Sequence, residues 1–209
     1  MGPKARKAAI RREVIARVLA MDPSDRASQE LALARRFEDL PGFAGASTVL
    51  LYVSAFAEEF DTFPILRRAL ALGRRLVLPT VDRRSRTLRL YEVAELDRDL
   101  VPGHRGIPEP GPGRPEVDPL AVDWALVPGL GFDDRGHRLG RGAGHYDRLL
   151  PRLRPEVPRW ALVLDAQWVA DLPTEPHDQP LDGVADHLRT CYGHRSADGH
   201  SSPAFDGPE

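Results

Sequence analysis

The sequence predicts a single α/β domain of three layers, in which helices flank a mostly parallel central sheet. Residues 48–81 carry this prediction, because a helix-length segment there separates two short apolar runs rich in β-branched residues. Strand, helix and strand in this order form a βαβ unit, whose two strands lie parallel in one sheet. Further short apolar runs later in the chain add buried strands to the same sheet.

Composition restricts the class of protein. The chain has 209 residues, with 42% hydrophobic and 29% charged residues, as in an ordinary globular domain. Its formal net charge of −2 gives no case for a general nucleic-acid or membrane surface. The single cysteine, Cys191, excludes an internal disulfide and the usual structural zinc sites. The basic start lacks the apolar core of a signal peptide, and no apolar run approaches bilayer length, so we expect a cytoplasmic protein.

Two helices are predicted at the start of the chain. Apolar residues recur at helical spacing over residues 4–19, and a second helix runs through residues 31–40. Lys7 and Arg11 are four residues apart, so they lie on one face of the first helix. A basic pair of this kind is either a solvated face or two cations aimed at a phosphate, and the spacing alone leaves both readings open.

The βαβ unit consists of a strand at 48–53, a helix at 62–73 and a strand at 75–81. Glu58 and Glu59 follow the first of these strands. Open α/β sheets bind their ligands at this edge, where the strands end. Adjacent glutamates in a loop are usually just solvated, but this position makes at least one of them a candidate for ligand binding.

The rest of the chain adds strands and one long connection. Residues 98–119 are rich in proline and glycine and predict an irregular segment, which is typical of functional or disordered loops. Within it, residues 107–110 look the most ordered. We place the domain at residues 1–193 and expect the polar segment 194–209 to be a disordered tail. The further predicted strands are residues 88–93, at the edge of the sheet, 159–164 and 183–191.

The most informative segment is the glycine-rich stretch from Pro128 to Arg148, which follows a short buried strand at 124–127. A strand, a glycine loop and a helix start form a layout in which backbone N–H groups cradle an anion. A purely structural glycine turn is the alternative, but guanidinium groups suit phosphate oxygens and favour phosphate binding. The Walker A and dinucleotide fingerprints are both absent. The interleaved arginines are Arg135, Arg138, Arg141 and Arg148.

Asp147 lies at the predicted helix start, beside the phosphates. A carboxylate there repels phosphate unless Mg²⁺ lies between them, so a metal role is natural. Stabilisation of the carboxylate by the helix dipole is an equal alternative. Asp178, which follows His177 in a later loop, can reach the same metal if its strand neighbours the strand of the glycine loop. The chain has no GxSxG or HExxH motif and no cysteine placed as a nucleophile, so covalent catalysis is not supported.

These motifs together resemble the 5-formyltetrahydrofolate cyclo-ligase family, the 5,10-methenyltetrahydrofolate synthetases. The resemblance extends over residues 7–186, and the glycine-rich signature is its most specific part. This chain has His145 where the family usually has the first of two tyrosines. The motifs that carry the resemblance are Lys7-Ala-Ala-Ile-Arg11, then Tyr52 with Glu59-Phe-Asp-Thr62, then Pro128 to Arg148, and finally Gln167, Leu172-Pro173, His177-Asp178 and Leu181-Asp182.

The resemblance implies an ATP-driven cyclisation of 5-formyltetrahydrofolate to 5,10-methenyltetrahydrofolate, with release of ADP and phosphate. The formyl oxygen attacks the γ-phosphorus, and an amine of the substrate then attacks the activated carbon and expels phosphate. Because the substrate supplies both nucleophiles, the protein need only align two ligands and neutralise charge.

The resemblance also implies a set of site residues. Those for ATP are Lys7, Arg11, Arg138, Leu139, Gly140, Arg141, Gly142, Ala143, Gly144, His145 and Tyr146. Those for folate are Val53, Glu59, Arg141, Gly142, Ala143, Gly144 and His145, with Glu58 as a rival to Glu59. Mg²⁺ is assigned to Asp147 and Asp178, and catalytic roles are assigned to Arg141 and Arg148.

We therefore expect a small-molecule substrate, with or without a polyglutamyl tail, no nucleic-acid or membrane partner, and a monomer or weak homodimer. Two other functions fit the same fold. A folate- or nucleotide-binding module without turnover would not need both metal carboxylates. An enzyme like a sugar-phosphate isomerase would need no ATP.

Overall fold

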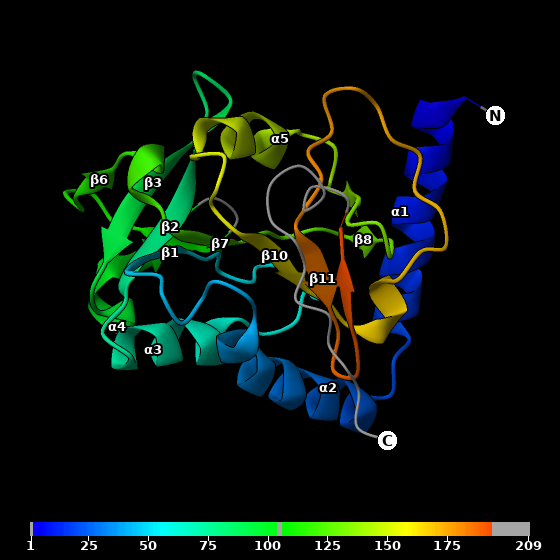
Figure 1. Ribbon diagram of the computed structural model, residues 1–209, viewed down its shortest axis with the longest axis horizontal. Helices are drawn as coiled ribbons and strands as arrows, with labels where there is room; N and C mark the ends of the chain where they lie inside the picture. The colour runs from blue at the N-terminus through cyan, green and yellow to red at the C-terminus, as the bar shows by residue number, and fades with distance from the viewer. Residues whose placement is uncertain (1, 104–105, 194–209) are drawn as a thin grey trace.

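A central sheet of eight strands organises the computed structural model, which describes residues 2–103 and 106–193 (Figure 1). The strand order is β12-β11-β10-β7-β1-β2-β3-β6. The five inner strands from β11 to β2 are parallel, which confirms the predicted mostly parallel sheet. Their bounds are β1 Thr48–Leu50, β2 Arg75–Asp82, β7 Trp124–Leu126, β10 Arg159–Leu162 and β11 Gly183–Ala185.

Antiparallel strands close both ends of this sheet. β3 (Thr87–Val93) pairs with β2, and the short β6 (Glu116–Val117) pairs on its outer side, so the prediction of β3 as an edge strand was wrong. The predicted last strand is in fact two strands, β11 and β12 (Thr190–Tyr192), which pair as a hairpin. The chain reverses between them where the Asp186 carboxylate accepts backbone N–H groups.

Helices cover both faces of the sheet, as the three-layer prediction requires. One face packs against buried residues of α1, α2 and α3, and the other packs against α5 and the turn that follows it. None of the helices in the described part of the chain is long and apolar enough to cross a membrane. The helix bounds are α1 Pro3–Leu19, α2 Pro23–Arg36, α3 Phe63–Ala71, α4 Leu96–Asp99 and α5 His145–Leu149.

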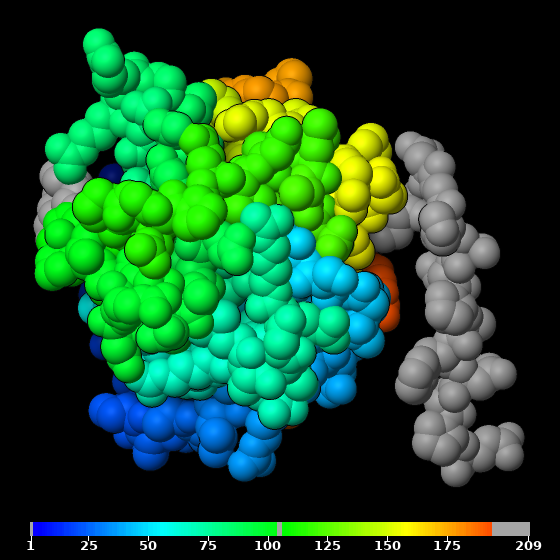
Figure 2. Space-filling model, turned by 90° about the vertical axis from the view of Figure 1, so that its left-hand side faces the viewer, coloured from blue at the N-terminus to red at the C-terminus, as the bar shows by residue number. Residues whose placement is uncertain are grey.

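The proline-rich connection is more ordered than the sequence predicts. It begins at the end of α4 and contains a small hairpin of β4 (Leu100–Pro102) and β5 (Pro108–Pro110). A buried carboxylate organises it, because Asp99 accepts N–H groups of the preceding turn and pairs with the Arg114 guanidinium. A single side chain that accepts hydrogen bonds from the backbone N–H groups of a loop leaves no periodic pattern in the sequence. Figure 2 shows this segment, in green, covering one end of the molecule below the projecting β2–β3 hairpin.

Two predictions concern residues outside the described part of the chain. The expected disordered tail, 194–209, lies outside it entirely, and so do residues 104–105 of the proline-rich connection.

Candidate active site

A cavity of about 490 Å³ opens where β1, β2 and β7 end. Tyr52 and Val53 follow β1, and Pro128 and Gly129 follow β7, so the cavity lies at the edge where α/β sheets bind ligands. α1, β5 and the glycine loop complete its wall. Every residue predicted to bind ATP, folate or metal lines this one cavity: Lys7, Arg11, Val53, Glu59, Arg138, Leu139, Gly140, Arg141, Gly142, Ala143, Gly144, His145, Tyr146, Asp147 and Asp178.

The glycine-rich stretch folds as a small hairpin, an open loop and a short helix. The hairpin consists of β8 (Gly131–Phe132) and β9 (Arg138–Leu139), and α5 begins at His145. Gly144 precedes the helix with φ +65°, a left-handed conformation that glycine adopts without a Cβ penalty. The helix therefore starts two residues before Asp147, and that carboxylate lies in its first turn, facing the cavity.

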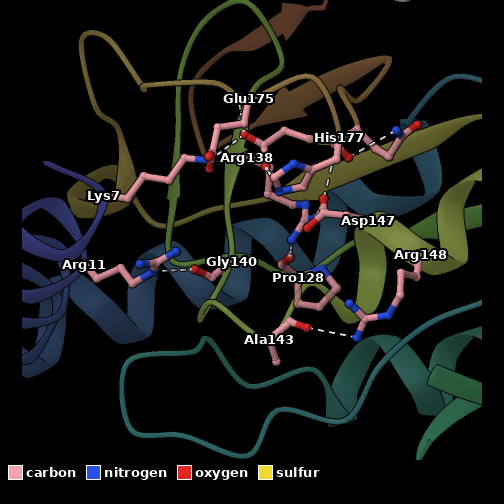
Figure 3. A network of polar contacts seen from close by, with 12 residues as sticks. Lys7, Arg11, Pro128, Arg138, Gly140, Ala143, Asp147, Arg148, Glu175 and His177 are labelled. Carbon is pink, nitrogen blue, oxygen red and sulfur yellow. Dashed lines mark hydrogen bonds and ion pairs between the residues drawn. The ribbon is translucent and has the colours of Figure 1, made fainter. Parts of the chain in front are cut away.

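Arg138 and Asp147 form a buried ion pair in the cavity wall. The Arg138 side chain is only 4% exposed, and its Nη2 lies 2.6 Å from Asp147 Oδ1 (Figure 3). A second nitrogen of the guanidinium donates to the Pro128 carbonyl. Burial lowers the pKa of Arg138, and the Asp147 carboxylate opposes this effect. Among the described residues, Arg138 Nε and the Tyr146 hydroxyl find no hydrogen-bond partner although they are buried, which leaves polar atoms for a ligand to satisfy.

Lys7 forms a second cation–carboxylate cluster with the segment 175–178. Its Nζ lies 2.6 Å from Asp178 Oδ2 and 2.8 Å from Glu175 Oε2. Burial acts to lower the pKa of Lys7, but hydrogen bonds to the two carboxylates outweigh it and raise the pKa above its ordinary value. Burial acts to raise the pKa of Asp178. The hydrogen bond from Lys7 opposes this effect and holds the pKa of that carboxyl below its ordinary value.

The two predicted metal carboxylates come from neighbouring segments. Asp147 Oδ1 lies 3.5 Å from the backbone N–H of Gln179, which directly follows Asp178. The structure thus brings together the helix start and the later loop. Nevertheless, each carboxylate already faces a cation, Asp147 through Arg138 and Asp178 through Lys7.

At the other side of the cavity, Arg141 lies on an aromatic ring. Its guanidinium carbon is 3.4 Å from the centroid of the Phe56 ring. Arg141 Nη2 lies 2.9 Å from a Glu58 oxygen and 3.5 Å from a Glu59 oxygen. Of the two glutamates, Glu59 lines the cavity, and it also accepts the N–H groups of Ala55 and Phe56. Burial raises the pKa of Glu59, although these N–H groups and Arg141 act against the rise.

Arg148 does not have the position expected of a catalytic residue. It is absent from the cavity wall as far as the described residues define it. Its guanidinium donates to the Ala143 carbonyl (Figure 3) and to the Arg86 carbonyl. The Arg86 carbonyl also contacts His145 Nδ1 at 3.0 Å. In this arrangement Arg148 braces the glycine loop against the β2–β3 hairpin, and its catalytic role stays a prediction.

Comparison with known proteins identifies the family. The sequence model of the 5-formyltetrahydrofolate cyclo-ligase family matches residues 3–186. The chain belongs to this family. The mitochondrial 5-formyltetrahydrofolate cyclo-ligase of Arabidopsis thaliana is 31% identical over 202 residues, covering 85% of this chain and 73% of that protein. The 5-formyltetrahydrofolate cyclo-ligase of Escherichia coli K12 is 31% identical over 167 residues, covering 79% and 91%.

Solved structures agree with this membership. A 5,10-methenyltetrahydrofolate synthetase from Aquifex aeolicus has a TM-score of 0.78 and 29% identity, covering 96% of this chain and 97% of that one. A second synthetase, from Mycoplasma pneumoniae, has a TM-score of 0.68 at 20% identity and supports the fold alone. The predicted fold class, the cyclo-ligase family and the ligase class of enzyme are thereby confirmed.

The cavity of this cyclo-ligase family member has donors that suit a divalent cation. Carboxylate oxygens are the ligands that Mg²⁺ prefers. Asp178 belongs to a group with Glu175 and His177, whose ligand atoms all lie within 4.8 Å of one another. Asp147 lies outside this group, in the adjacent wall. The residues present therefore fit the expected metal, provided that Lys7 moves away from Glu175 and Asp178.

Sequence reasoning missed several residues of the site. Glu175 belongs to no metal-binding sequence motif. Its place in the site is shown by its contact with Lys7, which is 168 positions away in the chain. Phe56 has no sequence signal beyond its place after β1. The ordered-looking portion of the proline-rich connection does reach the cavity, through Ile107, Pro108 and Glu109.

Proposed function

We propose that this chain catalyses the ATP- and Mg²⁺-dependent cyclisation of 5-formyltetrahydrofolate to 5,10-methenyltetrahydrofolate, with release of ADP and phosphate. One observation carries the proposal beyond family membership: all fifteen predicted ATP, folate and metal residues line a single cavity. Its volume of about 490 Å³ lies within the range of small-molecule sites, roughly 300 to 1,000 Å³.

The phosphates of ATP are assigned to the side that holds Lys7, Arg11 and Arg138. The two arginines touch the glycine stretch directly, since Arg11 Nε donates to the Gly140 carbonyl and Arg138 lies in β9. The open loop 140–144 adds backbone N–H groups beside these cations. Cations and N–H groups in one wall neutralise the charge that phosphoryl transfer must spread.

The folate is assigned to the side that holds Val53, Glu59 and Arg141. Phe56 and the edge of β2 supply apolar surface there, and Glu59 supplies a hydrogen-bond acceptor at the end of β1. Arg141 belongs to the glycine loop, which is assigned to ATP as well, and its guanidinium contacts Phe56 and the glutamates on the folate side. It is the residue best placed to touch both ligands.

The reaction then proceeds in two displacements. The formyl oxygen attacks the γ-phosphorus, its bond to phosphorus forms, and the bond to the ADP oxygen breaks. The neighbouring amine of the substrate attacks the activated formyl carbon, loses its proton, and expels the formyl oxygen as part of inorganic phosphate. The protein holds the two ligands in line and keeps water from the phosphorylated intermediate.

Asp147 and Asp178 are the proposed Mg²⁺ ligands, and Glu175 is a further one on the side of Asp178. When bound, the ion neutralises phosphate charge and orients the γ-phosphoryl group. The chain's own contribution is to hold these carboxylates on two adjacent segments, the first turn of α5 and the loop 175–178.

The test mixes the protein with Mg-ATP and 5-formyltetrahydrofolate and follows the near-ultraviolet absorbance of the methenyl product. We expect the absorbance to rise only when ATP is present, with one ADP released per product. Absence of an ATP-dependent signal from the folded protein would contradict the proposal. Tight binding of both ligands without turnover would indicate the non-catalytic binding module instead.

A further inference from the structure

Two roles assigned to this cavity meet at one contact. Lys7 is assigned to ATP and Asp178 to Mg²⁺, yet the ammonium and the carboxylate lie 2.6 Å apart. The second oxygen that holds Lys7 belongs to Glu175, which is also in the candidate metal group. Lys7 Nζ therefore contacts one oxygen of each of two carboxylates that belong to the candidate metal group.

Competition between the two cations would be strong at this place. The Lys7 side chain is 9% exposed and that of Asp178 is 20% exposed, so water screens their charges weakly. Asp178 Oδ2 also accepts the backbone N–H of Glu175, which fixes the carboxylate in position. A metal ion and an ammonium that shared these oxygens would be in close contact and would repel each other.

Lys7 is the cation of this cavity that can leave its partner. Its charge stands on a flexible four-carbon stem, so Nζ can swing while α1 stays in place. Arg138, by contrast, is held by Asp147 and by the Pro128 carbonyl and is almost fully buried. Arg11 is bonded to a backbone carbonyl, that of Gly140, and its movement would release no carboxylate.

We propose that Lys7 is an internal counter-ion that competes with the divalent cation for Glu175 and Asp178, and that the phosphates of the nucleotide release these carboxylates by attracting Lys7. The inference rests on the proposed ATP- and Mg²⁺-dependent function. It implies that the metal binds weakly to the protein alone and that Lys7 couples metal binding to nucleotide binding. Because such coupling is reciprocal, each ligand strengthens binding of the other by the same factor.

The test measures binding of Mn²⁺ to the full chain without nucleotide, from the electron paramagnetic resonance signal of free Mn²⁺. The Lys7→Met variant should bind Mn²⁺ at least about tenfold more tightly than the wild type, because the competing charge is gone. Added Mg²⁺ should displace the bound Mn²⁺. The matched control is Lys4→Met, one turn earlier on α1 and in the same cavity wall, which should leave Mn²⁺ affinity unchanged.

Two further variants test the site of the gain. Lys7→Gln keeps a hydrogen-bond donor toward the carboxylates and should show the same gain as Lys7→Met, even if the apolar side chain disturbs folding. The double variant Lys7→Met with Asp178→Asn should lose the gain. An unchanged Mn²⁺ affinity in folded Lys7→Gln, or a gain that survives Asp178→Asn, would overturn the inference.

The nucleotide dependence completes the test. A non-hydrolysable ATP analogue should tighten Mn²⁺ binding more in the wild type than in Lys7→Met, and equal tightening would contradict coupling through Lys7. Failure of this inference is distinct from failure of the proposed function. If the chain has cyclo-ligase activity but the Lys7 variants bind Mn²⁺ no more tightly than the wild type, only the counter-ion role of Lys7 is removed. If the Lys7 variants bind Mn²⁺ more tightly but the chain lacks cyclo-ligase activity, competition between Lys7 and the metal is supported and the proposed reaction is removed.

Discussion

The two sides of the cavity hold their charges in different ways. On the side of Lys7 and Arg138, each cation faces a carboxylate from another segment of the chain. On the side of Arg141, the guanidinium lies over the Phe56 ring as well as facing Glu58 and Glu59, and Glu59 is also held by backbone N–H groups. On the first side Lys7 can exchange partners on its flexible stem while Arg138 stays in place, whereas the second side offers an aromatic surface for a flat ligand. The difference supports the proposal that the first side receives the phosphates and metal and the second receives the folate.

The largest effect is expected at the phosphate side. Asp147→Asn should lower turnover about 100-fold or more, because it removes a charge that the metal requires. The amide keeps an oxygen that can accept from Arg138, so the protein should remain folded. Steady-state turnover and circular dichroism measure the two properties. Retained activity would remove Asp147 from the metal site.

Lys7→Ala should affect binding at the ATP side of the cavity and leave the folate side unchanged. The apparent Michaelis constant for ATP should rise about tenfold through loss of one phosphate contact, while the constant for folate changes little. Initial rates at varied concentrations of each substrate give both constants. If only the folate constant moved, the assignment of α1 to the nucleotide would be wrong.

The adjacent glutamates provide a matched pair for the folate side. Glu59→Gln should raise the Michaelis constant for folate about tenfold, since a charged hydrogen-bond acceptor in the cavity wall is lost. Glu58→Gln should have a smaller effect, because Glu58 contacts Arg141 from outside the wall. The same rate measurements apply. A larger effect at Glu58 would reverse the choice between the two residues.

The smallest expected effect is the change of the unfolding free energy with pH. The sign of this change differs between Glu59 on the folate side and Asp178 on the phosphate side. Burial raises the pKa of Glu59, so the folded state keeps this proton to higher pH than the unfolded state. The unfolding free energy should therefore fall as pH rises from the ordinary glutamate pKa through the raised one. The pKa of Asp178 is lowered, so its contribution is lost instead as pH falls through the lowered value.

Thermal midpoints measured against pH check this contrast. Glu59→Gln should remove the decline on the alkaline side of its window and leave the acid limb in place. Asp178→Asn should flatten the acid limb. Curves that stay parallel to the wild type in both variants would show that neither carboxylate titrates differently in the folded protein.

Local patterns predicted much of the fold and most of the cavity. The βαβ unit follows from two apolar runs with a helix-length segment between them, and the glycine loop follows from the Pro128–Arg148 signature. Contacts between distant segments left no such pattern. The contact of Lys7 with Asp178 joins residues 171 positions apart. The contact of Arg148 with the Arg86 carbonyl, at the tip of a hairpin, is likewise not encoded in any spacing of residues.

Some failures of prediction have the same physical origin. β3 was placed at the edge because β6 is only two residues long, too short for an alternating pattern. The proline-rich connection has no hydrophobic periodicity, so its sequence predicts an irregular segment. Its order comes instead from the contacts of the Asp99 carboxylate. Side chains that satisfy a loop from within act through three-dimensional proximity, which a linear pattern does not show.

The central claim is that the cavity joins both ligands so that the formyl oxygen reaches the γ-phosphorus. The most direct measurement uses 5-formyltetrahydrofolate with oxygen-18 in the formyl group, together with Mg-ATP, and determines the label in inorganic phosphate by mass spectrometry. The account predicts one labelled oxygen in each phosphate released with methenyl product. Unlabelled phosphate, formed while methenyl product accumulates, would contradict it.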